Sequence, residues 1–238
     1  MPYRNMTLED FARHIGMPLA EVARLAERGK LPCEKVGGKW RFNRARVTEW
    51  LQEQMPTLSE ERLLAIERAM ASDDPEDRTT HIVTGMMSVD GIDMFVRAGS
   101  RSSILRELVA LAERTDLLYD PDGLLDAVNA REEMCSTALP NGVAIPHPRQ
   151  PMPYVSAEPL ICLARVPQGV PFGSPDGVLT QLFFLICSHE DRQHLQVLAR
   201  LVRMLDKETV DALRGTDAAE EALALLIRRE EQVAERDR

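Results

Sequence analysis

The residue best placed for chemistry is His147, in the segment Leu139-Pro140-Asn141-Gly142-Val143-Ala144-Ile145-Pro146-His147-Pro148-Arg149. Pro146 and Pro148 lack a backbone N–H and fix φ, so neither a helix nor a central strand can continue through this point. We therefore expect His147 on a rigid loop behind a tight turn. An imidazole presented in this way suits a nucleophile or a ligand, and the alternative is a surface histidine without chemistry.

The residues before this loop favour a nucleophilic role for His147. A predicted helix over 120–131 ends at the arginine of an Arg-Glu pair, and a Ser-Thr pair and then Asn-Gly-Val-Ala-Ile-Pro-His follow. This order resembles the enzyme IIA domains of the bacterial phosphoenolpyruvate-dependent phosphotransferase system, in its fructose, mannitol and nitrogen-related branch. The resemblance implies that His147 is phosphorylated. Pro148 is a departure, since the family usually has glycine there, and it stiffens the loop without displacing the imidazole.

The resemblance also implies a second active-site histidine, here His194 in Asp191-Arg192-Gln193-His194-Leu195. His194 lies on the inward edge of a predicted helix, near its N-terminus, where it could meet a phosphoryl group. Without the resemblance, a buried structural histidine would be the better interpretation. His189 faces elsewhere on the start of this helix, and we treat it as non-catalytic.

Phosphoryl transfer depends on donors aimed at the equatorial oxygens more than on covalent help. Arg131 is the first candidate for this role. Ser136 and Thr137 follow, through their hydroxyls or the backbone N–H groups of the turn. No cofactor is expected. Cys33, Cys135, Cys162 and Cys187 show no C-x-x-C spacing, so we expect no metal site and interpret them as reduced, small packing residues.

The composition is that of a globular protein, with 238 residues of which 44% are apolar. No apolar run approaches the ~20 residues that span a bilayer, and the N-terminus lacks a secretory pattern. We therefore expect a cytoplasmic protein without membrane insertion. Residues 1–50 hold ten Lys or Arg against six Asp or Glu, whereas the remainder holds 19 against 32. This asymmetry predicts two domains with different partners, and a basic head points to nucleic acid.

The basic head has the pattern of two short helices and a hairpin. Thr7 and Asp10 form a near capping box, Gly16 and Gly29 end the two helices, and Gly37-Gly38 centres the hairpin. Residues 6–54 resemble the excisionase-type and MerR-like winged helix-turn-helix domains, which implies double-stranded DNA as a partner. The candidate DNA-binding residues are Arg24, Arg28, Lys35, Lys39 and Arg41. Glu34 would stand opposite Arg41 and partly neutralise it, and the alternative is a protein-docking module.

The predicted domains are a winged helix-turn-helix domain over 1–55, a helical and acidic linker over 56–80, and an enzyme IIA type-2 domain over 81–238. A capping box at 57–60 opens the linker helix, whose stripe of Leu63, Ile66 and Met70 could cover its own domain or pair with a second copy. The last domain alternates strands and helices. Strands are expected over 92–97, 160–166 and 179–187, and helices over 103–112, 120–131, 188–205 and 216–229. The fold class is α/β, with a mixed sheet flanked by helices.

The leading functional hypothesis is a bacterial transcriptional regulator whose DNA binding is controlled by reversible phosphorylation of His147. Its expected partners are the phosphocarrier protein HPr or its nitrogen-branch counterpart, DNA, and a second copy in a homodimer. One alternative is an enzyme IIA component that passes phosphate to a separate IIB domain. Another is a signalling adaptor that binds proteins through both domains. The chain would be a phosphoryl-transfer intermediate more than a free-standing catalyst.

Overall fold

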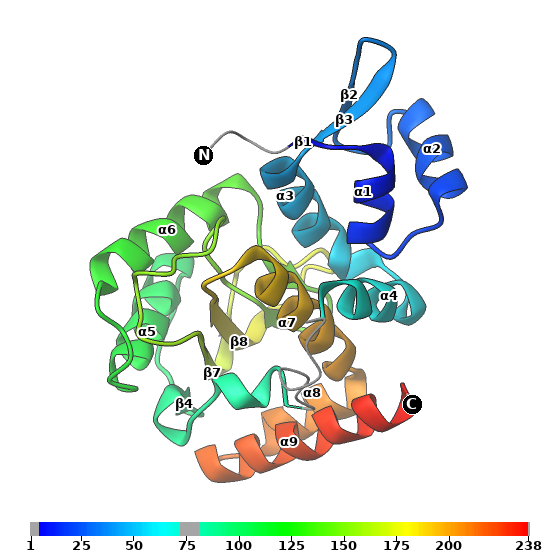
Figure 1. Cartoon of the computed structure of the whole chain (residues 1–238). Coiled ribbons are helices and arrows are strands. Elements are labelled where there is room, and N and C mark those ends of the chain that lie inside the picture. Colours follow the sequence, from blue (N-terminus) through cyan, green and yellow to red (C-terminus); the bar gives the residue numbers. More distant parts are fainter. Residues whose placement is uncertain (1–4, 72–80, 238) are drawn as a thin grey trace. The chain divides into compact units, whose positions relative to one another are not determined.

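The computed structural model describes residues 5–71 and 81–237, and its contacts divide the chain into two compact units (Figure 1). The first unit contains the chain up to Arg78 together with Asp191–Arg203. The second contains Thr79–Glu190 and Met204–Arg238. The domain boundaries expected from the sequence stay a prediction.

The first unit begins with the predicted helix-turn-helix. Helix α1 (Leu8–His14) starts at Thr7, whose hydroxyl accepts the Asp10 N–H at 3.1 Å while the Asp10 carboxylate accepts the Thr7 N–H at 3.1 Å. This reciprocal pair confirms the expected capping box. Gly16, at φ 62°, lets the chain turn into α2 (Leu19–Glu27), which Pro18 precedes. The two short helices therefore form as the sequence predicts.

A three-stranded sheet follows the two helices. Strands β2 (Cys33–Val36) and β3 (Lys39–Asn43) form the predicted hairpin, and both turn glycines have positive φ, as a two-residue type I′ turn requires. A short β1 (Asn5–Met6), which the sequence analysis did not foresee, pairs with β3 to give the order β1-β3-β2. Phe42 of β3 is buried and stacks on Phe11 of α1, with ring centroids 4.2 Å apart. This stack and α3 (Arg44–Gln54) close the small core.

Helices α4 (Glu60–Met70) and α7 (Asp191–Met204) complete this unit, α7 as far as Arg203. Ser59, not Thr57, caps α4, because the chain up to Thr57 forms the short 3-10 helix η1 (Met55–Thr57). The apolar stripe of α4 is buried within the single chain. The expected helix is thus present, but it starts later than the sequence suggested.

Charged side chains join α4 to α7 inside this unit. The buried carboxylate of Glu67 on α4 accepts a hydrogen bond from Arg203 at 2.7 Å and another from Arg200, and both arginines belong to α7. Arg192 of α7 donates to the carbonyl oxygen of Ala71 at 2.7 Å. The start of α7 is therefore joined to the end of α4 by a hydrogen bond, and the last turns of α7 are joined to α4 by a buried carboxylate shared between two guanidiniums.

The second unit is built on a mixed five-stranded sheet in the order β4-β7-β8-β6-β5. Strands β7 (Leu160–Val170) and β8 (Thr180–Cys187) form its antiparallel centre. Strands β4 (Ile92–Asp93) and β6 (Val143–Ala144) run parallel to their neighbours β7 and β8, and β5 (Ala138–Leu139) pairs antiparallel with β6. The central strands are almost continuously buried, as expected for a sheet covered on both faces.

Helices α5 (Arg101–Glu113) and α6 (Pro121–Met134) lie side by side and share a core with one face of this sheet (Figure 1). Helices α8 (Lys207–Gly215) and α9 (Ala219–Arg236) contact each other, and they also contact β8 and β4 respectively. Short 3-10 helices η3 (Thr84–Met86) and η4 (Val89–Gly91) precede β4. The observed architecture is the predicted α/β class, with a mixed sheet flanked by helices.

Several expected element boundaries of this unit were wrong. The strand expected over 92–97 ends at Asp93, because the Asp93 carboxylate accepts the Phe95 N–H at 2.9 Å and turns the chain. Helix α5 starts earlier than the expected residue 103, because Ser100 caps it and the Ser103 hydroxyl in turn accepts the Ser100 N–H at 3.0 Å. Helix α8, capped by Asp206, was not expected.

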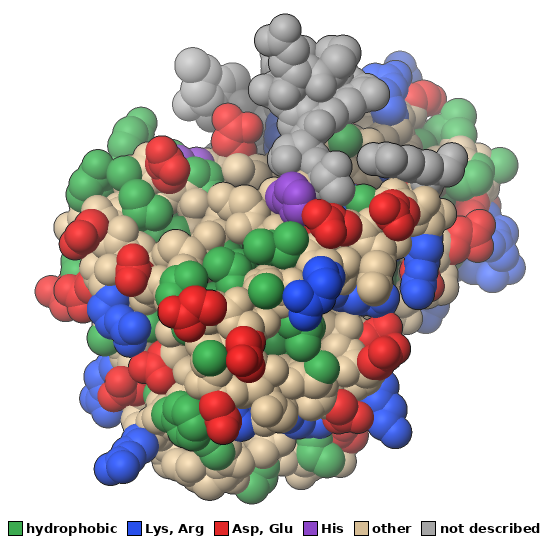
Figure 2. Space-filling view, turned by 90° about the horizontal axis from the view of Figure 1, so that it is seen from below, with side chains coloured by type: hydrophobic (Ala, Val, Ile, Leu, Met, Phe, Trp, Pro, Cys, Tyr) green, Lys and Arg blue, Asp and Glu red, His purple; other side chains and the backbone are tan. Residues whose placement is uncertain are grey.

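The cysteines and the surface also differ in part from expectation. Cys162 and Cys187 are buried, and burial raises the pKa of their thiols to about 12 and about 11, but Cys33 is half-buried and Cys135 is exposed. In the view of Figure 2, acidic and basic side chains are interspersed with apolar ones. Within residues 5–71 and 81–237, no helix has the length and apolar character needed to cross a bilayer.

Candidate functional site

The loop that carries His147 leaves the sheet directly after β6. Asn141 and Gly142 join β5 to β6, and both have positive φ, 71° and 76°. After β6, the Ile145 N–H donates to the Thr137 carbonyl oxygen at 3.1 Å, and the Pro146 carbonyl oxygen accepts the Ile186 N–H at 3.0 Å. The backbone on the N-terminal side of His147 is therefore bonded at two successive residues, to the residue before β5 and to β8, which agrees with the rigid loop expected from the prolines.

The imidazole of His147 is only 3% exposed and has a defined orientation. Its Nδ1 lies 2.7 Å from the carbonyl oxygen of Ile145. Because a carbonyl oxygen only accepts, Nδ1 carries the proton in the neutral imidazole, and Nε2 holds the lone pair. The loop thus leaves Nε2 as the ring nitrogen that carries the lone pair a nucleophile needs.

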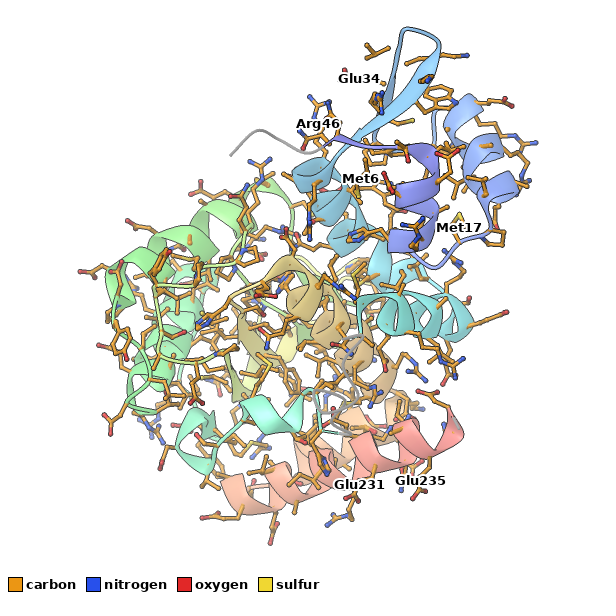
Figure 3. The ribbon with its side chains drawn as sticks, viewed as in Figure 1. Met6, Met17, Glu34, Arg46, Glu231 and Glu235 are labelled. Carbon is orange, nitrogen blue, oxygen red and sulfur yellow. The ribbon has the colours of Figure 1, made fainter. Side chains whose placement is uncertain are left out.

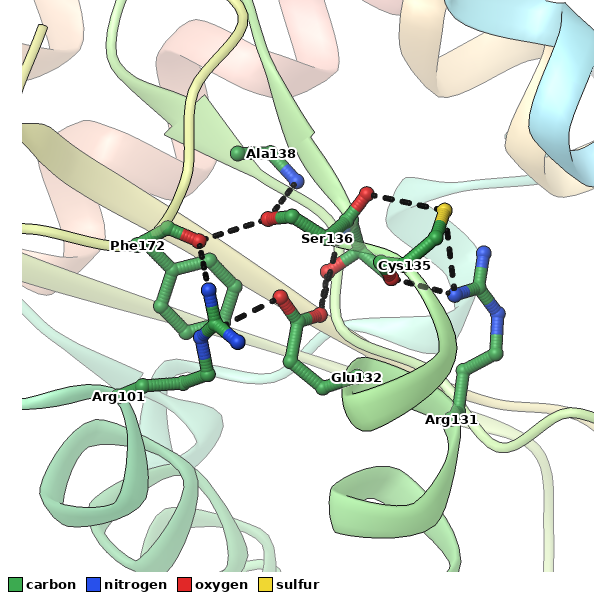
Figure 4. A network of polar contacts seen from close by, with 8 residues as sticks. Arg101, Arg131, Glu132, Cys135, Ser136, Ala138 and Phe172 are labelled. Atoms are coloured by element: carbon green, nitrogen blue, oxygen red, sulfur yellow. Dashed lines mark hydrogen bonds and ion pairs between the residues drawn. The ribbon is translucent and has the colours of Figure 1, made fainter. Parts of the chain in front are cut away.

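A polar network organises the turn between α6 and β5, as Figure 4 shows. The carboxylate of Glu132 accepts the backbone N–H of Thr137 at 3.0 Å and its hydroxyl at 2.7 Å. The Ser136 hydroxyl donates to the Phe172 carbonyl oxygen at 2.7 Å, and Arg101 donates to the same oxygen at 3.0 Å. The two hydroxyls named as candidate phosphoryl ligands therefore give their protons to partners within the chain, and their proposed role stays a prediction.

Arg131, the first candidate for charge stabilisation, is 5% exposed and belongs to the last turn of α6. One of its guanidinium nitrogens donates to the carbonyl oxygen of Cys135 at 2.8 Å, which draws the side chain toward the turn rather than into solvent (Figure 4). Arg131, Ser136 and Thr137 are brought together within this turn. The arrangement thus gathers one cation and two hydroxyls at this turn. The hydrogen bond from the Ile145 N–H to the Thr137 carbonyl oxygen joins the turn to the His147 loop.

Sequence reasoning missed Glu132 and Arg101 as organising residues. Burial raises the pKa of Glu132, and the hydrogen bonds from Thr137 and the charge of Arg101 act against that shift. The Arg101 Nε lies 3.7 Å from the second oxygen of Glu132. The Arg-Glu pair in the motif was the signal that could have identified Glu132, whereas Arg101 lies 31 positions earlier and has no local signal.

His194 is buried on α7, with 3% of its surface exposed, as its inward position in the helix predicted. It belongs to the first unit, so its part in the chemistry of His147 stays a prediction. His189 lies 3.1 Å from the hydroxyl of Ser156, a structural contact of the second unit.

The candidate DNA-binding residues occupy α2 and the hairpin. Arg24, Arg28, Lys35 and Lys39 are exposed, and Arg41 is half-buried. Glu34 pairs with Arg41 in the strand register, as expected, but its carboxylate bonds to Arg46 of α3 at 2.9 Å (Figure 3). Lys35 lies over the Trp40 ring, 5.3 Å from its centroid. The acidic residue of the hairpin thus forms an ion pair with Arg46, which the sequence analysis did not consider.

A mixed five-stranded sheet covered by helices, with a buried histidine on a loop that leaves the sheet, defines an α/β domain of the enzyme IIA type. The sequence profile of the phosphoenolpyruvate-dependent sugar phosphotransferase system EIIA 2 family matches residues 86–229, and this chain belongs to that family. A helix-turn-helix profile matches residues 6–55. The resemblance to the enzyme IIA domains and the resemblance to helix-turn-helix domains are therefore both confirmed.

Individual relatives match over the enzyme IIA part. A nitrogen regulatory protein from Pseudomonas aeruginosa is 29% identical over 135 residues, which are 56% of this chain and 86% of that protein. The PTS system fructose-specific EIIABC component of Bacillus subtilis is 27% identical over 130 residues, and this chain spans only 20% of its length. The crystal structure of nitrogen regulatory protein IIA-Ntr from Neisseria meningitidis aligns with a TM-score of 0.55 at 28% identity, over 61% of this chain and 99% of that one.

Proposed function

We propose that this protein is a bacterial transcriptional regulator whose DNA binding is controlled by reversible phosphorylation of His147. The observation that carries the proposal is the packing of α7. This helix lies within the segment that matches the EIIA family, yet it belongs to the same compact unit as the helix-turn-helix. This shared packing supports a coupling between the phosphotransfer segment and the helix-turn-helix.

In the proposed mechanism, Nε2 of His147 attacks the phosphoryl group of a phosphohistidine carrier such as HPr or its nitrogen-branch counterpart. The Nδ1–H bond to Ile145 holds the ring in place and supports the positive charge that develops on the imidazole. Arg131 stabilises the phosphoryl oxygens, and His194, Ser136 and Thr137 assist it. The acceptor returns the group readily, as a reversible switch requires.

On DNA, α2 enters the major groove with Arg24 and Arg28, and the hairpin places Lys35, Lys39 and Arg41 near phosphates. Phosphorylation adds close to two negative charges at His147. The response reaches the head through α7, whose Arg200 and Arg203 bind Glu67 of α4 and whose Asp191 lies 3.5 Å from Arg44 of α3. A second copy of the chain is the proposed partner in DNA binding.

The competing function is that of an enzyme IIA carrier that passes phosphate to a IIB domain. The relatives that contain further transport components favour it, among them the fructose-specific EIIABC component. If the protein were only such a carrier, it would be phosphorylated but would have no sequence-specific affinity for DNA. The helix-turn-helix match is the feature that it leaves unexplained.

The test begins with labelling from phosphoenolpyruvate by enzyme I and HPr, which should give an acid-labile, base-stable phosphoprotein. His147→Ala should abolish the label, and undiminished labelling of that variant would reject the site. DNA fragments selected from a genomic library by the unmodified protein then serve as probes. We expect phosphorylation to change their affinity by ~5- to 150-fold at fixed salt, the range of ordinary allosteric coupling. Equal affinities in both states would reject the coupling, and a failure to select any sequence would favour the carrier.

A further inference from the structure

Among the described residues of the second unit, two that are not glycine have positive φ, Asp116 and Asn141. Asn141, at φ 71°, lies in the turn before the phosphorylation loop, and Gly142 follows it at 76°. The left-handed region is uncommon for residues with a Cβ, although asparagine adopts it more readily than most, and bonds to the rest of the protein help to hold such a turn. Asn141 lies only six positions before His147, with the short strand β6 between them.

The two ends of Asn141 are held by opposite charges from different elements. Its backbone N–H donates to the carboxylate of Asp176, in the connection between β7 and β8, at 2.8 Å. Its carbonyl oxygen accepts a hydrogen bond from the guanidinium of Arg214 on α8. The polarity is correct at both ends, because the carboxylate faces the N–H and the cation faces the carbonyl.

Each of the two charged residues is itself fixed. The second oxygen of Asp176 lies 2.5 Å from the Ser174 hydroxyl and accepts the Val178 N–H at 3.2 Å. The bond from Ser174, followed by those from Asn141 and Val178, lowers the pKa of the carboxyl. Arg214 also bonds to Asp211, one turn earlier on α8, at 3.1 Å. A side chain at Gly142 would meet the Arg214 guanidinium at 2.5 Å, so the glycine is what allows this close approach.

We infer that Asp176 and Arg214 are positioning residues for phosphoryl transfer, which hold the Asn141-Gly142 turn so that β6 delivers His147 in its reactive orientation. The inference rests on the proposed phosphorylation of His147. The hydrogen bonds of both residues described above go to the backbone of Asn141. They act through the backbone, because β6 has only two residues and pairs with both β5 and β8, so a shift of the turn moves the strand and the loop together.

The test uses the full-length protein and phosphoramidate, a small phosphoryl donor that needs no docking surface. Asp176→Ala should slow phosphorylation of His147 by ~10- to 100-fold, the usual consequence of a misplaced reacting group. Asp176→Asn keeps an oxygen that can accept the Asn141 N–H, and it should recover most of the rate. Arg214→Met should be slow, and Arg214→Lys should recover part of the rate.

Asp93→Ala is the matched control. Asp93, at the end of β4, also accepts a backbone N–H, from Phe95 at 2.9 Å, and binds an arginine, Arg114 at 3.1 Å, but these bonds do not involve the Asn141-Gly142 turn. Its phosphorylation rate should equal that of the parent. Nitrogen NMR of labelled histidine supplies a second readout, since the Nδ1–H signal of His147 should broaden in Asp176→Ala and stay sharp in the control.

The outcomes separate the two hypotheses. If the parent protein is not phosphorylated at all, the proposed function fails. If the parent is phosphorylated and folded Asp176→Ala and Arg214→Met react at the parental rate with an unchanged Nδ1–H signal, the positioning role is rejected. If Asp176→Ala does not fold, the comparison of Arg214→Met with Arg214→Lys decides the question in the same way.

Discussion

Replacing Glu67 by alanine tests the buried charge cluster of the first unit. The side chain of Glu67 is 6% exposed, and those of its partners Arg200 and Arg203 are 8% and 1% exposed. Removal of one member of a buried ion pair costs about 3 to 5 kcal/mol, because the remaining charges lose the partner that offset their desolvation. We expect a loss of that size in the free energy of unfolding, which is a large share of the ~5 to 15 kcal/mol that stabilises a typical domain.

Urea unfolding followed by tryptophan fluorescence measures this loss directly, because both tryptophans of the chain, Trp40 and Trp50, belong to the first unit. Glu34→Ala is the control, since the Glu34–Arg46 pair is 70% and 65% exposed and should contribute at most ~1 kcal/mol. Replacing the whole cluster by apolar residues should be nearly neutral, unlike the single change. A loss in Glu67→Ala no larger than that in Glu34→Ala would refute the reasoning.

Three further outcomes are expected. Burial, helped by the charges of Arg44 and Arg192, lowers the pKa of His14 from 6.5 to about 4. The contribution of His14 to stability is therefore complete above about pH 6.5 and is lost as the pH falls through about 4. The free energy of unfolding of His14→Gln in urea should depend less steeply on pH over this window, and an equal pH dependence in the parent and the variant would contradict the prediction. Lys39→Ala should reduce the salt dependence of DNA binding by about one unit for all sequences, and an unchanged slope would remove Lys39 from the interface. His194→Ala should slow transfer to His147 while leaving some label, and a parental rate would show that it does not assist.

Local sequence patterns were sufficient to predict a structural feature wherever the residues that determine it are close in the sequence. The Thr7 capping box and the Gly37-Gly38 turn were both predictable, because the partners lie three residues apart or fewer. The proline-flanked loop of His147 was predictable for the same reason, since the prolines themselves exclude helix and strand. The apolar runs of β7 and β8 identified the buried centre of the sheet.

The errors concern partners that only the folded chain brings together. Strand β1 has two residues and exists only because β3 lies beside it. The sequence analysis assigned no role to Glu67, because its partner Arg203 lies 136 positions later. The positioning residues Asp176 and Arg214 lie 35 and 73 positions from Asn141, so no spacing rule could have linked them to the phosphorylation loop.

The packing of α7 has a consequence for how such a protein can be divided or recombined. In chain order, the head ends before the enzyme IIA segment begins, yet the compact unit of the head includes Asp191–Arg203 from that segment. A gene fragment that encodes only the N-terminal residues would therefore supply Glu67 without either arginine. Exchange of the helix-turn-helix unit between such proteins would have to include the matching α7 residues. The residues that the unit needs are therefore encoded in the later part of the gene as well as near the junction of the two segments.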